Sequence, residues 1–371
     1  MAYKEPKYQQ VVAWVKENIE SGNFKSGEKL MSEAELSEKF GLSRQTIRHA
    51  TGELVNQNLV TRIKGSGTYI GTGPAPSVHK ERHMRIAVVS TFYESYIFPA
   101  ILKGIEAVLA EAGYSMQVSF TDNRISKEKE LLTDILRKDN VDGVIVEPAK
   151  SALPNPNIRY YREIQERGIP LIFFNSFYPE ISAPAVRLDD ENVARKATQL
   201  LIDRGHRTIA GIFKPDDGQG RLRYAGYLEA HLENGLSLDQ RRVLWPDTTA
   251  YLNMREIGDY MFRRMDGCTA AMCYNDEIAW QLTEMALERG IRIPEDFSIV
   301  GIDDSYLSGV SRVPLTSFPH PKEELGKKVA ANLIRMIGEP GFDGRYLFEC
   351  VPVIRESVAG PGCGIHITES L

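Results

Sequence analysis

The sequence predicts an α/β protein with a small, mainly helical N-terminal part and a larger body of two doubly wound parallel sheets. Two apolar-periodic runs with helix caps, between residues 32 and 56, indicate the helical part. From Met84 onward, apolar strands alternate with amphipathic helices, an order typical of parallel sheets covered by helices on both faces. Residues 71–83 (GTGPAPSVHKERH) show no apolar period and predict a linker. The predicted divisions are a domain at residues 1–72, a linker at residues 73–83 and a body at residues 84–362.

Helix caps define the N-terminal domain. Ser32 and Glu35 have the spacing of a capping box at the head of an apolar-periodic run, so a helix is expected to begin there. Gly41 supplies the left-handed residue that ends a helix, and Ser43 is placed to cap the next one. A preceding helix at residues 8–19 has apolar side chains at helical spacing. The sequence therefore predicts two helices joined by a tight turn, with a third helix packed behind them.

The second helix of this pair presents a polar face. Its buried stripe is predicted to contain Ile47, Ala50, Thr51, Leu54 and Val55. Arg44, Gln45 and Arg48 then lie near the start of the helix on the exposed side. Arginine can bond guanine and glutamine can bond adenine in the major groove, where the first turn of such a helix enters. These three residues are therefore predicted to read double-stranded DNA, the alternative being a solvated amphipathic helix.

A β-hairpin is expected after this helix. A short strand follows Leu59, residues 64–67 (KGSG) form a turn, and residues 68–70 form the second strand. The glycine-rich tip can approach phosphates closely, so Lys64 is predicted to contact the DNA backbone. Lys4 and Lys7, which flank the start of the first helix, are placed either to contact phosphate or to be solvated.

The motifs SEAELSEKFGLSRQTIRHATGELVNQNLV and KGSGTYI resemble the winged helix-turn-helix domain of the GntR family over roughly residues 5–71. The resemblance implies a winged helix-turn-helix fold and DNA contacts at Arg44, Gln45, Thr46, Arg48 and Gly67. Two positions depart from the family pattern. Met31 stands where proline is common, and Ala34 stands where many members have an arginine that contacts DNA, so that contact is not expected here.

Composition limits the partners of the body. The formal charge of the chain is −5, but residues 1–72 have 10 basic and 8 acidic side chains, so only the N-terminal domain is basic. Phosphates would repel the acidic remainder, which confines the expected nucleic-acid contacts to that domain. The chain has no apolar run of 18 residues and no signal-peptide core, which predicts a cytoplasmic protein without membrane contact. The four cysteines have neither zinc-ligand nor disulfide-framework spacing.

Polar residues follow the predicted strands of the body. In open α/β sheets a ligand lies beyond the carboxyl ends of the strands, so these residues are expected to converge on one cleft. The cleft is predicted between two lobes, with lobe 1 at about residues 84–175 and 321–349 and lobe 2 at about residues 176–318 and 350–362. The predicted strand-end residues are Tyr93, Glu94, Asp122, Asn123, Glu147, Asn175, Lys214, Asn275, Asp276, Asp303 and Asp304.

The predicted lining suits a sugar. Acids and amides can bond hydroxyl groups, and aromatic residues can stack on C–H faces. The aromatic candidates are Tyr93, Tyr96, Phe98 and Phe173. The sequence RIAVVSTFYESY contains no glycine-rich phosphate loop, which argues against a nucleotide. We also find no G-x-S-x-G elbow, metal-ligand cluster or glycosidase carboxylate pair, and therefore expect no catalytic residue, cofactor or metal.

Residues 84 to about 360 are similar to the effector domain of LacI/GalR repressors, which shares the fold of periplasmic sugar-binding proteins. The motifs are RLRYAGYLEA, YNDEIAW, IPEDFSIVGIDDSYLS, PLTSFPHPKEELGKKVAANLI and IRESV. The resemblance implies a two-lobed fold of the periplasmic-binding-protein type and effector contacts at Arg223, Asn275, Asp303 and His320. Placement at strand ends and aromatic character add Tyr93, Glu147, Lys150, Phe173 and Asn175 as effector-binding candidates. Structural roles are the alternative for each: a cap for Asp303, a turn for Asn275, an ion pair for Arg223 and a packing role for His320.

A GntR-type domain joined to this body, together with VEPAKSALPNPNI, GIFKPDDGQG and CYNDEIA, is similar to the arabinose-responsive repressors. The resemblance implies a repressor that binds operator DNA as a homodimer and is released by L-arabinose. Another pentose, a hexose or a purine is the nearest alternative effector. A sugar-transport binding protein and a sugar-modifying enzyme are the rival classes. The missing export signal and the basic N-terminal domain argue against the first, and a turnover assay would test the second.

Overall fold

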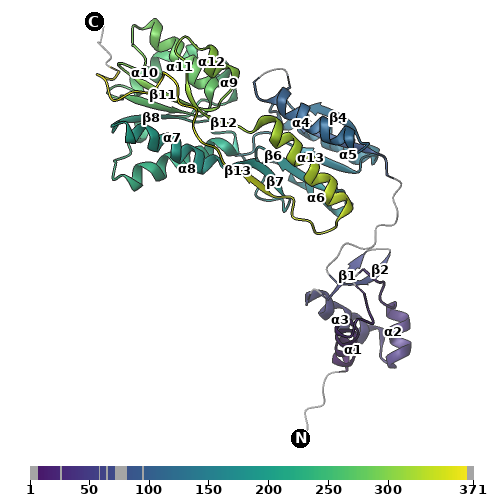
Figure 1. Cartoon of the computed structure of the whole chain (residues 1–371). Helices are drawn as coiled ribbons and strands as arrows, with labels where there is room; N and C mark the ends of the chain where they lie inside the picture. The colour runs from purple at the N-terminus through teal and green to yellow at the C-terminus, as the bar shows by residue number, and fades with distance from the viewer. Residues whose placement is uncertain are drawn as a thin grey trace. The chain divides into compact units, whose positions relative to one another are not determined.

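The computed structural model describes residues 7–25, 27–57, 59–63, 66–71, 82–93 and 96–365. The chain divides into two compact units between Arg82 and His83. The N-terminal unit contains three helices and a hairpin (Figure 1). These elements are α1 (Tyr8–Glu20), α2 (Glu33–Phe40), α3 (Arg44–Asn56), β1 (Val60–Ile63) and β2 (Gly67–Ile70).

The predicted caps of the N-terminal unit are confirmed. The Ser32 hydroxyl accepts a bond from the Glu35 amide at 3.3 Å, and the Glu35 carboxylate accepts one from the Ser32 amide at 2.7 Å. Gly41 ends α2 with φ 62°, and the Ser43 hydroxyl accepts a bond from the Thr46 amide at 3.2 Å. Local chemistry therefore fixes where α2 and α3 begin and where α2 ends.

A small apolar core holds the unit together. The strands β1 and β2 are antiparallel, with Val60 opposite Ile70. The buried residues from the helices and the hairpin are Val11, Val12, Val15, Leu30, Leu36, Ile47, Ala50, Leu54, Val60 and Ile70. The predicted stripe of α3 is buried except for the half-buried Val55. The predicted DNA contacts Lys4 and Lys64, and most of the predicted linker, lie outside the described residues.

Lobe 1 of the second unit is built on a six-stranded parallel sheet in the order β13-β7-β6-β5-β3-β4. Its strands are β3 (Arg85–Ser90), β4 (Ser115–Phe120), β5 (Gly143–Val146), β6 (Leu171–Phe174), β7 (Ala185–Leu188) and β13 (Tyr346–Phe348). The helices α4 (Phe98–Glu111) and α13 (Lys322–Gly338) lie side by side on one face although they are far apart in the sequence (Figure 1). The other face is covered by α5 (Ile125–Lys138) and α6 (Ile158–Glu166).

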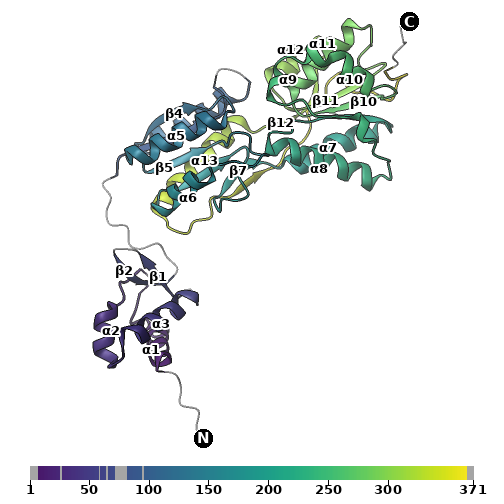
Figure 2. The same ribbon diagram turned by 180° about the vertical axis from the view of Figure 1, so that it is seen from behind.

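Lobe 2 is built on a five-stranded parallel sheet in the order β12-β11-β10-β8-β9. Its strands are β8 (Ile209–Ile212), β9 (Val243–Leu244), β10 (Ala270–Cys273), β11 (Ser298–Asp303) and β12 (Thr316–Pro319). One face carries α7 (Asp190–Asp203) and α8 (Gly218–Glu233), which lie side by side in both views (Figure 2). The remaining helices are α9 (Thr248–Leu252), α10 (Gly258–Arg264), α11 (Asp276–Glu288) and α12 (Tyr306–Val310), with two 3-10 turns at Gln240–Arg242 and Met254–Ile257.

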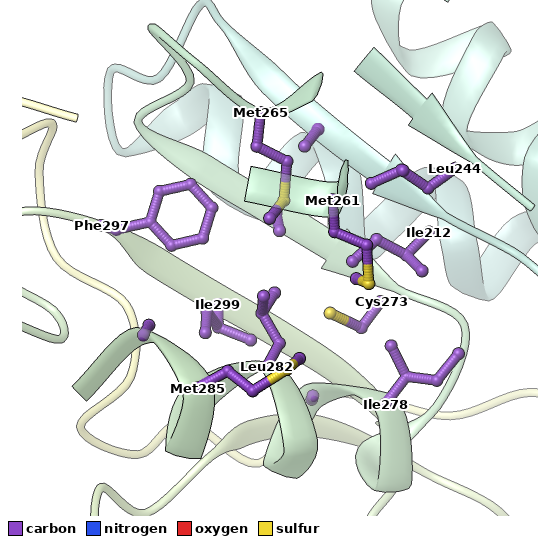
Figure 3. Close-up of a cluster of buried hydrophobic side chains, with 14 of the residues drawn as sticks. Ile212, Leu244, Met261, Met265, Cys273, Ile278, Leu282, Met285, Phe297 and Ile299 are labelled. Carbon is purple, nitrogen blue, oxygen red and sulfur yellow. The ribbon is translucent and has the colours of Figure 1, made fainter. Parts of the chain in front are cut away.

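The core on the second face of this sheet is tightly filled. Figure 3 shows Met261 of α10 and Met265, which follows this helix, opposite Leu282 and Met285 of α11, with Ile299 of β11 between them. All five side chains are almost completely buried. Methionine suits this irregular space because its unbranched side chain adapts to its neighbours.

The predicted α/β fold class is confirmed, with a correction at one lobe boundary. The prediction ended the first part of lobe 1 near residue 175. However, β7 pairs with β6 in the lobe 1 sheet, with Phe174 opposite Val186. The chain therefore enters lobe 2 only after Leu188, returns to lobe 1 between β12 and α13, and crosses again after β13. No helix among the described residues is long and apolar enough to cross a membrane.

Candidate functional site

The carboxyl ends of the strands of both lobes face a common cleft, as the sequence predicted. The cleft encloses about 830 Å³ of empty space, part of it open to solvent. Lobe 1 contributes Thr91, Phe92, Tyr96, Ile97, Phe98, Asn123, Glu147, Pro148, Ser151 and Ser176 to the lining. Lobe 2 contributes Lys214, Asp217, Gln219, Arg223, Tyr251, Leu252, Tyr274, Asn275, Glu277 and Asp303.

A buried arginine organises the lobe 2 wall. Arg223 of α8 donates to Asp190 at 2.8 Å and to Asp303 at 3.4 Å, and it also donates to the carbonyl of Tyr274. The second carboxylate oxygen of Asp303 accepts a bond at 2.5 Å from the hydroxyl of Tyr96, which belongs to lobe 1. Burial raises the pKa of both Asp190 and Asp303, against the opposing effect of the Arg223 charge. One chain of polar contacts thus joins α7, α8 and β11 to the facing lobe.

A second polar group lies at the start of α11. The side-chain oxygen of Asn275 accepts a bond from the Ile278 amide at 3.1 Å and so caps the helix. Its amide donates at 2.9 Å to the hydroxyl of Tyr251, which in turn donates to Glu277. Burial raises the pKa of Glu277. Asn275 therefore has both the structural role of a cap and a place in the cleft lining.

The lobe 1 wall contains a buried carboxylate. Glu147 accepts bonds from the amide and hydroxyl of Thr91 and, at 2.7 Å, from the side-chain amide of Asn175. The side-chain amide of Asn175 donates to Glu147, so the group that faces His320 is the Asn175 oxygen. This oxygen accepts a bond at 3.1 Å from Nε2 of His320. Burial raises the pKa of Glu147, and burial lowers the pKa of His320 to about 3, so the imidazole is neutral at physiological pH. Asn175 and His320 thus support the lining from behind.

Polar contacts also join the two lobes beside the cleft. Lys150 of lobe 1 pairs with Asp216 of lobe 2 at 3.0 Å, and the hydroxyl of Ser151 accepts a bond from the Gly218 amide at 2.9 Å. Asn123 donates at 2.8 Å to the hydroxyl of Thr248. We call the residues Asn123, Lys150, Ser151, Asp216, Gly218 and Thr248 the interlobe latch. A side chain could not be added at Gly218 without movement, since its Cβ would lie 2.5 Å from the Ser176 hydroxyl.

Backbone strain concentrates around the same cleft. Nine residues other than glycine have positive φ angles among the described residues, and seven of these lie at the ends of strands facing the cleft or in the loops that follow. These seven are Tyr96, Asp122, Asn123, Lys150, Asn175, Asp303 and Asp304. Strained conformations of this kind cost energy and cluster at ligand-binding sites in proteins. The positive φ angles thus gather at the same strand ends that face the cleft.

The structure brings together only part of the predicted effector set. Glu147, Arg223, Asn275 and Asp303 line the cleft. Lys150 lies in the latch, and Asn175 and His320 lie behind the lining. Two further candidates are placed elsewhere: Phe173 is fully buried in the core beneath α5 and α6, and Tyr93 is 46% exposed and packs against Phe120.

Other lining residues were missed or not singled out. Tyr96 and Phe98 are predicted as aromatic cleft residues, and Asn123 and Lys214 as strand-end residues, although none is among the effector-binding candidates; the structure places all four in the lining. Asp217, Tyr251 and Glu277 carried no strand-end signal, because they lie at the start of α8, in α9 and within α11. Glu277 lies in the first turn of α11, two residues after the cap Asn275.

The predicted DNA-reading residues lie on one surface of α3. Arg44, Gln45 and Arg48 are exposed, and the half-buried Thr46 bonds the Ser43 hydroxyl at 2.9 Å. Arg48 pairs with Glu33 of α2 at 3.4 Å. The same carboxylate pairs at 2.7 Å with Arg62 of β1, an exposed hairpin residue that the prediction missed.

Gly67 has a structural reason to be glycine. Its φ angle is 135°, and an added Cβ would lie 2.7 Å from Cε of Lys29. A larger residue would therefore both strain the backbone and displace the lysine. Its proposed phosphate contact remains a prediction.

A helix-turn-helix unit with a hairpin, joined to a two-lobed body with a polar cleft, defines a ligand-responsive DNA-binding regulator. The comparisons with known proteins agree. Residues 7–70 match bacterial regulatory proteins of the gntR family, and residues 178–358 match the periplasmic binding protein-like domain. The arabinose metabolism transcriptional repressor of Halalkalibacterium halodurans is 37% identical over 96% of this chain and 97% of its own length. The repressor of the same name from Geobacillus stearothermophilus is 37% identical over 95% of this chain and 97% of its own length.

This chain therefore belongs to the family of these transcriptional repressors, and it is a DNA-binding regulator with a gntR-type reader. A solved complex of the transcriptional regulator CelR with cellobiose is 26% identical and has a TM-score of 0.67, covering 85% of this chain and 90% of that one. The transcription regulator CcpA of Lactococcus lactis is 24% identical and has a TM-score of 0.66, covering 74% of this chain and 98% of that one. At this identity, the likeness supports the fold alone. Among the described residues, no group of three or more His, Cys, Asp or Glu side chains could hold a metal ion.

Proposed function

We propose that this repressor binds operator DNA as a homodimer through its N-terminal unit and binds L-arabinose in the interlobe cleft, which lowers its affinity for the operator. The observation that carries the proposal is the cleft chemistry. Its two cations are already paired, Arg223 with Asp190 and Asp303, and Lys214 with Asp217 at 2.7 Å. A phosphate or carboxylate would therefore find no unpaired positive charge, and it would also face the carboxylates of the lining.

An uncharged polyol, by contrast, needs no unpaired positive charge and is not repelled by the carboxylates. The acids and amides of the lining can accept or donate bonds to several hydroxyl groups, and the rings can contact the C–H faces of a sugar. The ring-bearing lining residues are Phe92, Tyr96, Phe98, Tyr251 and Tyr274. The names of the two relatives support L-arabinose as the particular sugar, and the complex of CelR with cellobiose shows that one protein of similar fold takes a sugar.

Calorimetric titration with a panel of sugars tests this proposal. L-arabinose should bind with one site per chain, more tightly than D-xylose, D-ribose or D-galactose, while D-arabinose 5-phosphate should not bind. Fluorescence anisotropy with a labelled operator fragment should then show release of the protein as L-arabinose is added. Tighter binding of another sugar would reassign the effector. Sugar binding without operator release would contradict the proposed regulation, and turnover of the sugar would favour an enzyme instead.

Asp303→Asn tests whether the cleft is the effector site, because it keeps the shape of the wild-type side chain and removes its charge. A charge-assisted bond contributes roughly 1.5 to 3 kcal/mol, so L-arabinose affinity should fall at least about tenfold. Operator affinity in the absence of sugar should not change, which would make the variant a repressor that cannot be induced. Release of this variant at wild-type sugar concentrations would place the effector site elsewhere.

A further inference from the structure

Lobe 2 has a second cavity, separate from the effector cleft. It lies between α8, the segment that follows β9, and α10, and it encloses about 1280 Å³ of empty space that is partly open to solvent. Val243 and Leu244 of the edge strand β9 form its floor. Both floor residues are buried, and Leu244 packs into the lobe core beside Ile212 and Met261 (Figure 3). The floor therefore cannot move without disturbing the core.

Exposed aromatic rings form two walls of this cavity. Trp245 is 40% exposed, although Tyr224 and Phe213 hold its indole at ring-centroid distances of 4.9 and 5.6 Å. Tyr260 is 49% exposed, and Arg264 donates to its hydroxyl at 2.9 Å. Arg264 is itself fixed by bonds to the backbone carbonyls of residues 240 and 241. Both rings are thus held in place while their outer faces remain open.

Polar groups stand beside these rings at the rim. Asp247 uses one carboxylate oxygen to cap α9, accepting bonds from the amides of Thr249 at 3.0 Å and Ala250 at 2.9 Å. Its other oxygen can accept a bond from a ligand, and the side-chain amide of Gln240 can both donate and accept. Fixed rings combined with a carboxylate and an amide are the chemistry that binds a sugar, whose C–H face stacks on a ring while its hydroxyls bond at the edge.

The helix α9 separates this cavity from the effector cleft. Asp247 and Ala250 face the second cavity, whereas Tyr251 lines the cleft. Thr248, between them, donates to Asp216 at 2.6 Å and accepts a bond from Asn123 in the latch. A ligand that contacts the start of this five-residue helix therefore touches the same element that closes the cleft.

We propose that this cavity is a second carbohydrate site, which binds a neutral sugar between Trp245 and Tyr260 and modulates the effector cleft through α9. The inference does not depend on L-arabinose being the effector, because it concerns different residues. It predicts that the two sites are coupled, and such coupling is reciprocal and typically changes affinity by roughly 5- to 150-fold.

Fluorine NMR of the full-length protein labelled with 5-fluorotryptophan tests the site. The chain has three tryptophans, so Trp14 and Trp280 act as internal controls, and Trp245→Phe assigns the third resonance. D-xylose, D-glucose and maltose are titrated in turn into the wild type and into Asn275→Ala, in which the effector cleft is impaired. At least one sugar should shift the Trp245 resonance to saturation in both proteins. Tyr260→Ala should abolish that saturation while leaving the starting resonance in place.

A Trp245 resonance that does not move, or that drifts linearly without saturation, would overturn the site. Saturation by adenosine but by none of the sugars would overturn the carbohydrate assignment.

The coupling is tested by titrating L-arabinose with and without a saturating second sugar, which should change the affinity for L-arabinose by about fivefold or more. Thr248→Val should remove that change but keep the Trp245 shift. An unchanged affinity in the wild type would refute the role of α9, whereas failure of L-arabinose to bind at all would concern only the effector cleft.

Discussion

The DNA-reading surface and the effector cleft use arginine in opposite ways. The Arg48 side chain is 69% exposed and shares its partner Glu33 with the hairpin. The Arg223 side chain is 2% exposed and is held by two buried carboxylates. An exposed pair contributes at most about 1 kcal/mol, whereas breaking a buried pair typically costs about 3 to 5 kcal/mol. DNA recognition can therefore be altered in the N-terminal unit without loss of stability. In the cleft, by contrast, a substitution at Arg223 should change both ligand recognition and stability.

The largest expected effect comes from Arg223→Met. The substitution keeps much of the side-chain volume but leaves Asp190 and Asp303 buried without their cation. The free energy of unfolding of the body should fall by about 3 to 5 kcal/mol, as measured by urea denaturation followed by circular dichroism. Sugar binding should be lost as well.

Arg255→Met is the control, because Arg255 also forms a close ion pair, at 2.6 Å with Glu288, but its side chain is 59% exposed. Its unfolding free energy should stay within about 0.5 kcal/mol of the wild type. Similar losses in the two variants would show that burial is not what makes Arg223 important.

The pH dependence of stability should also distinguish the body from the N-terminal unit. Burial, followed by the nearby charge of Asp303, raises the pKa of Asp276 to about 7 in the folded protein, against an ordinary value of 3.8. Because the folded-state pKa is raised, the stabilisation by the neutral carboxyl is complete below about pH 4 and is lost as the pH rises through about 7. At about 1.4 kcal/mol per pKa unit, the body should lose up to about 4 kcal/mol of stability over this window.

Asp276→Asn removes the titrating group, so its unfolding free energy should depend less on pH between 4 and 7 than that of the wild type. Urea denaturation at several pH values in this range provides the measurement. Parallel curves for the two proteins would mean that other buried acids, such as Glu147 and Glu277, cause the whole dependence.

The same contrast explains how much could be predicted from the sequence. The signals of the N-terminal unit are local: Ser32 and Gly41 each act within four residues of their position, so the helix ends were predictable. The cleft instead depends on which face of a strand meets which helix. Phe173 lies in a strand that is apolar throughout, because helices cover both faces of the sheet, and nothing in that pattern shows which way the ring points.

Irregular segments account for the other differences between the sequence predictions and the structure. Tyr251 lies in a short helix between residues 236 and 258, where no strand or long helix pattern exists to place it. The predicted lobe boundary near residue 175 falls too early because residues 176–184, which include two prolines, form neither helix nor strand. In the structure these residues lead to β7, whose four residues carry too little pattern to be recognised as a strand.

Arg48→Ala should produce the next largest effect, and it should act on recognition alone. Loss of a bidentate contact to a base would reduce operator affinity by about 1 to 3 kcal/mol and relax sequence preference, as measured by fluorescence anisotropy with operator and scrambled DNA. The unfolding free energy should not change measurably, because the Arg48 side chain is exposed. Arg137→Ala removes an equally exposed charge from lobe 1 and should leave operator binding unchanged. Equal losses on both DNA sequences would reassign Arg48 to the phosphate backbone.

The smallest effect is expected at Lys150, where the sequence and the structure suggest different roles. The sequence predicts an effector contact, but the structure places Lys150 in the interlobe latch, with its side chain 31% exposed and paired with Asp216. A partly exposed pair of this kind contributes up to about 1 kcal/mol, so Lys150→Met should weaken L-arabinose binding by only about two- to fivefold. Added salt should weaken binding in the wild type more than in the variant, because the pair is partly screened.

A double-mutant cycle distinguishes the latch from a direct contact. Lys150→Met and Asp216→Asn, alone and together, are compared by calorimetric titration with L-arabinose. If the pair acts by holding the lobes closed, the double variant should bind about as well as either single variant, since each removes the same interaction. A direct contact would give a different result: Lys150→Met would cost more than about tenfold, and its effect would add to that of Asp216→Asn. That outcome would return Lys150 to the effector-binding set and would mean that the lobes close further on the sugar than the contact with Asp216 allows.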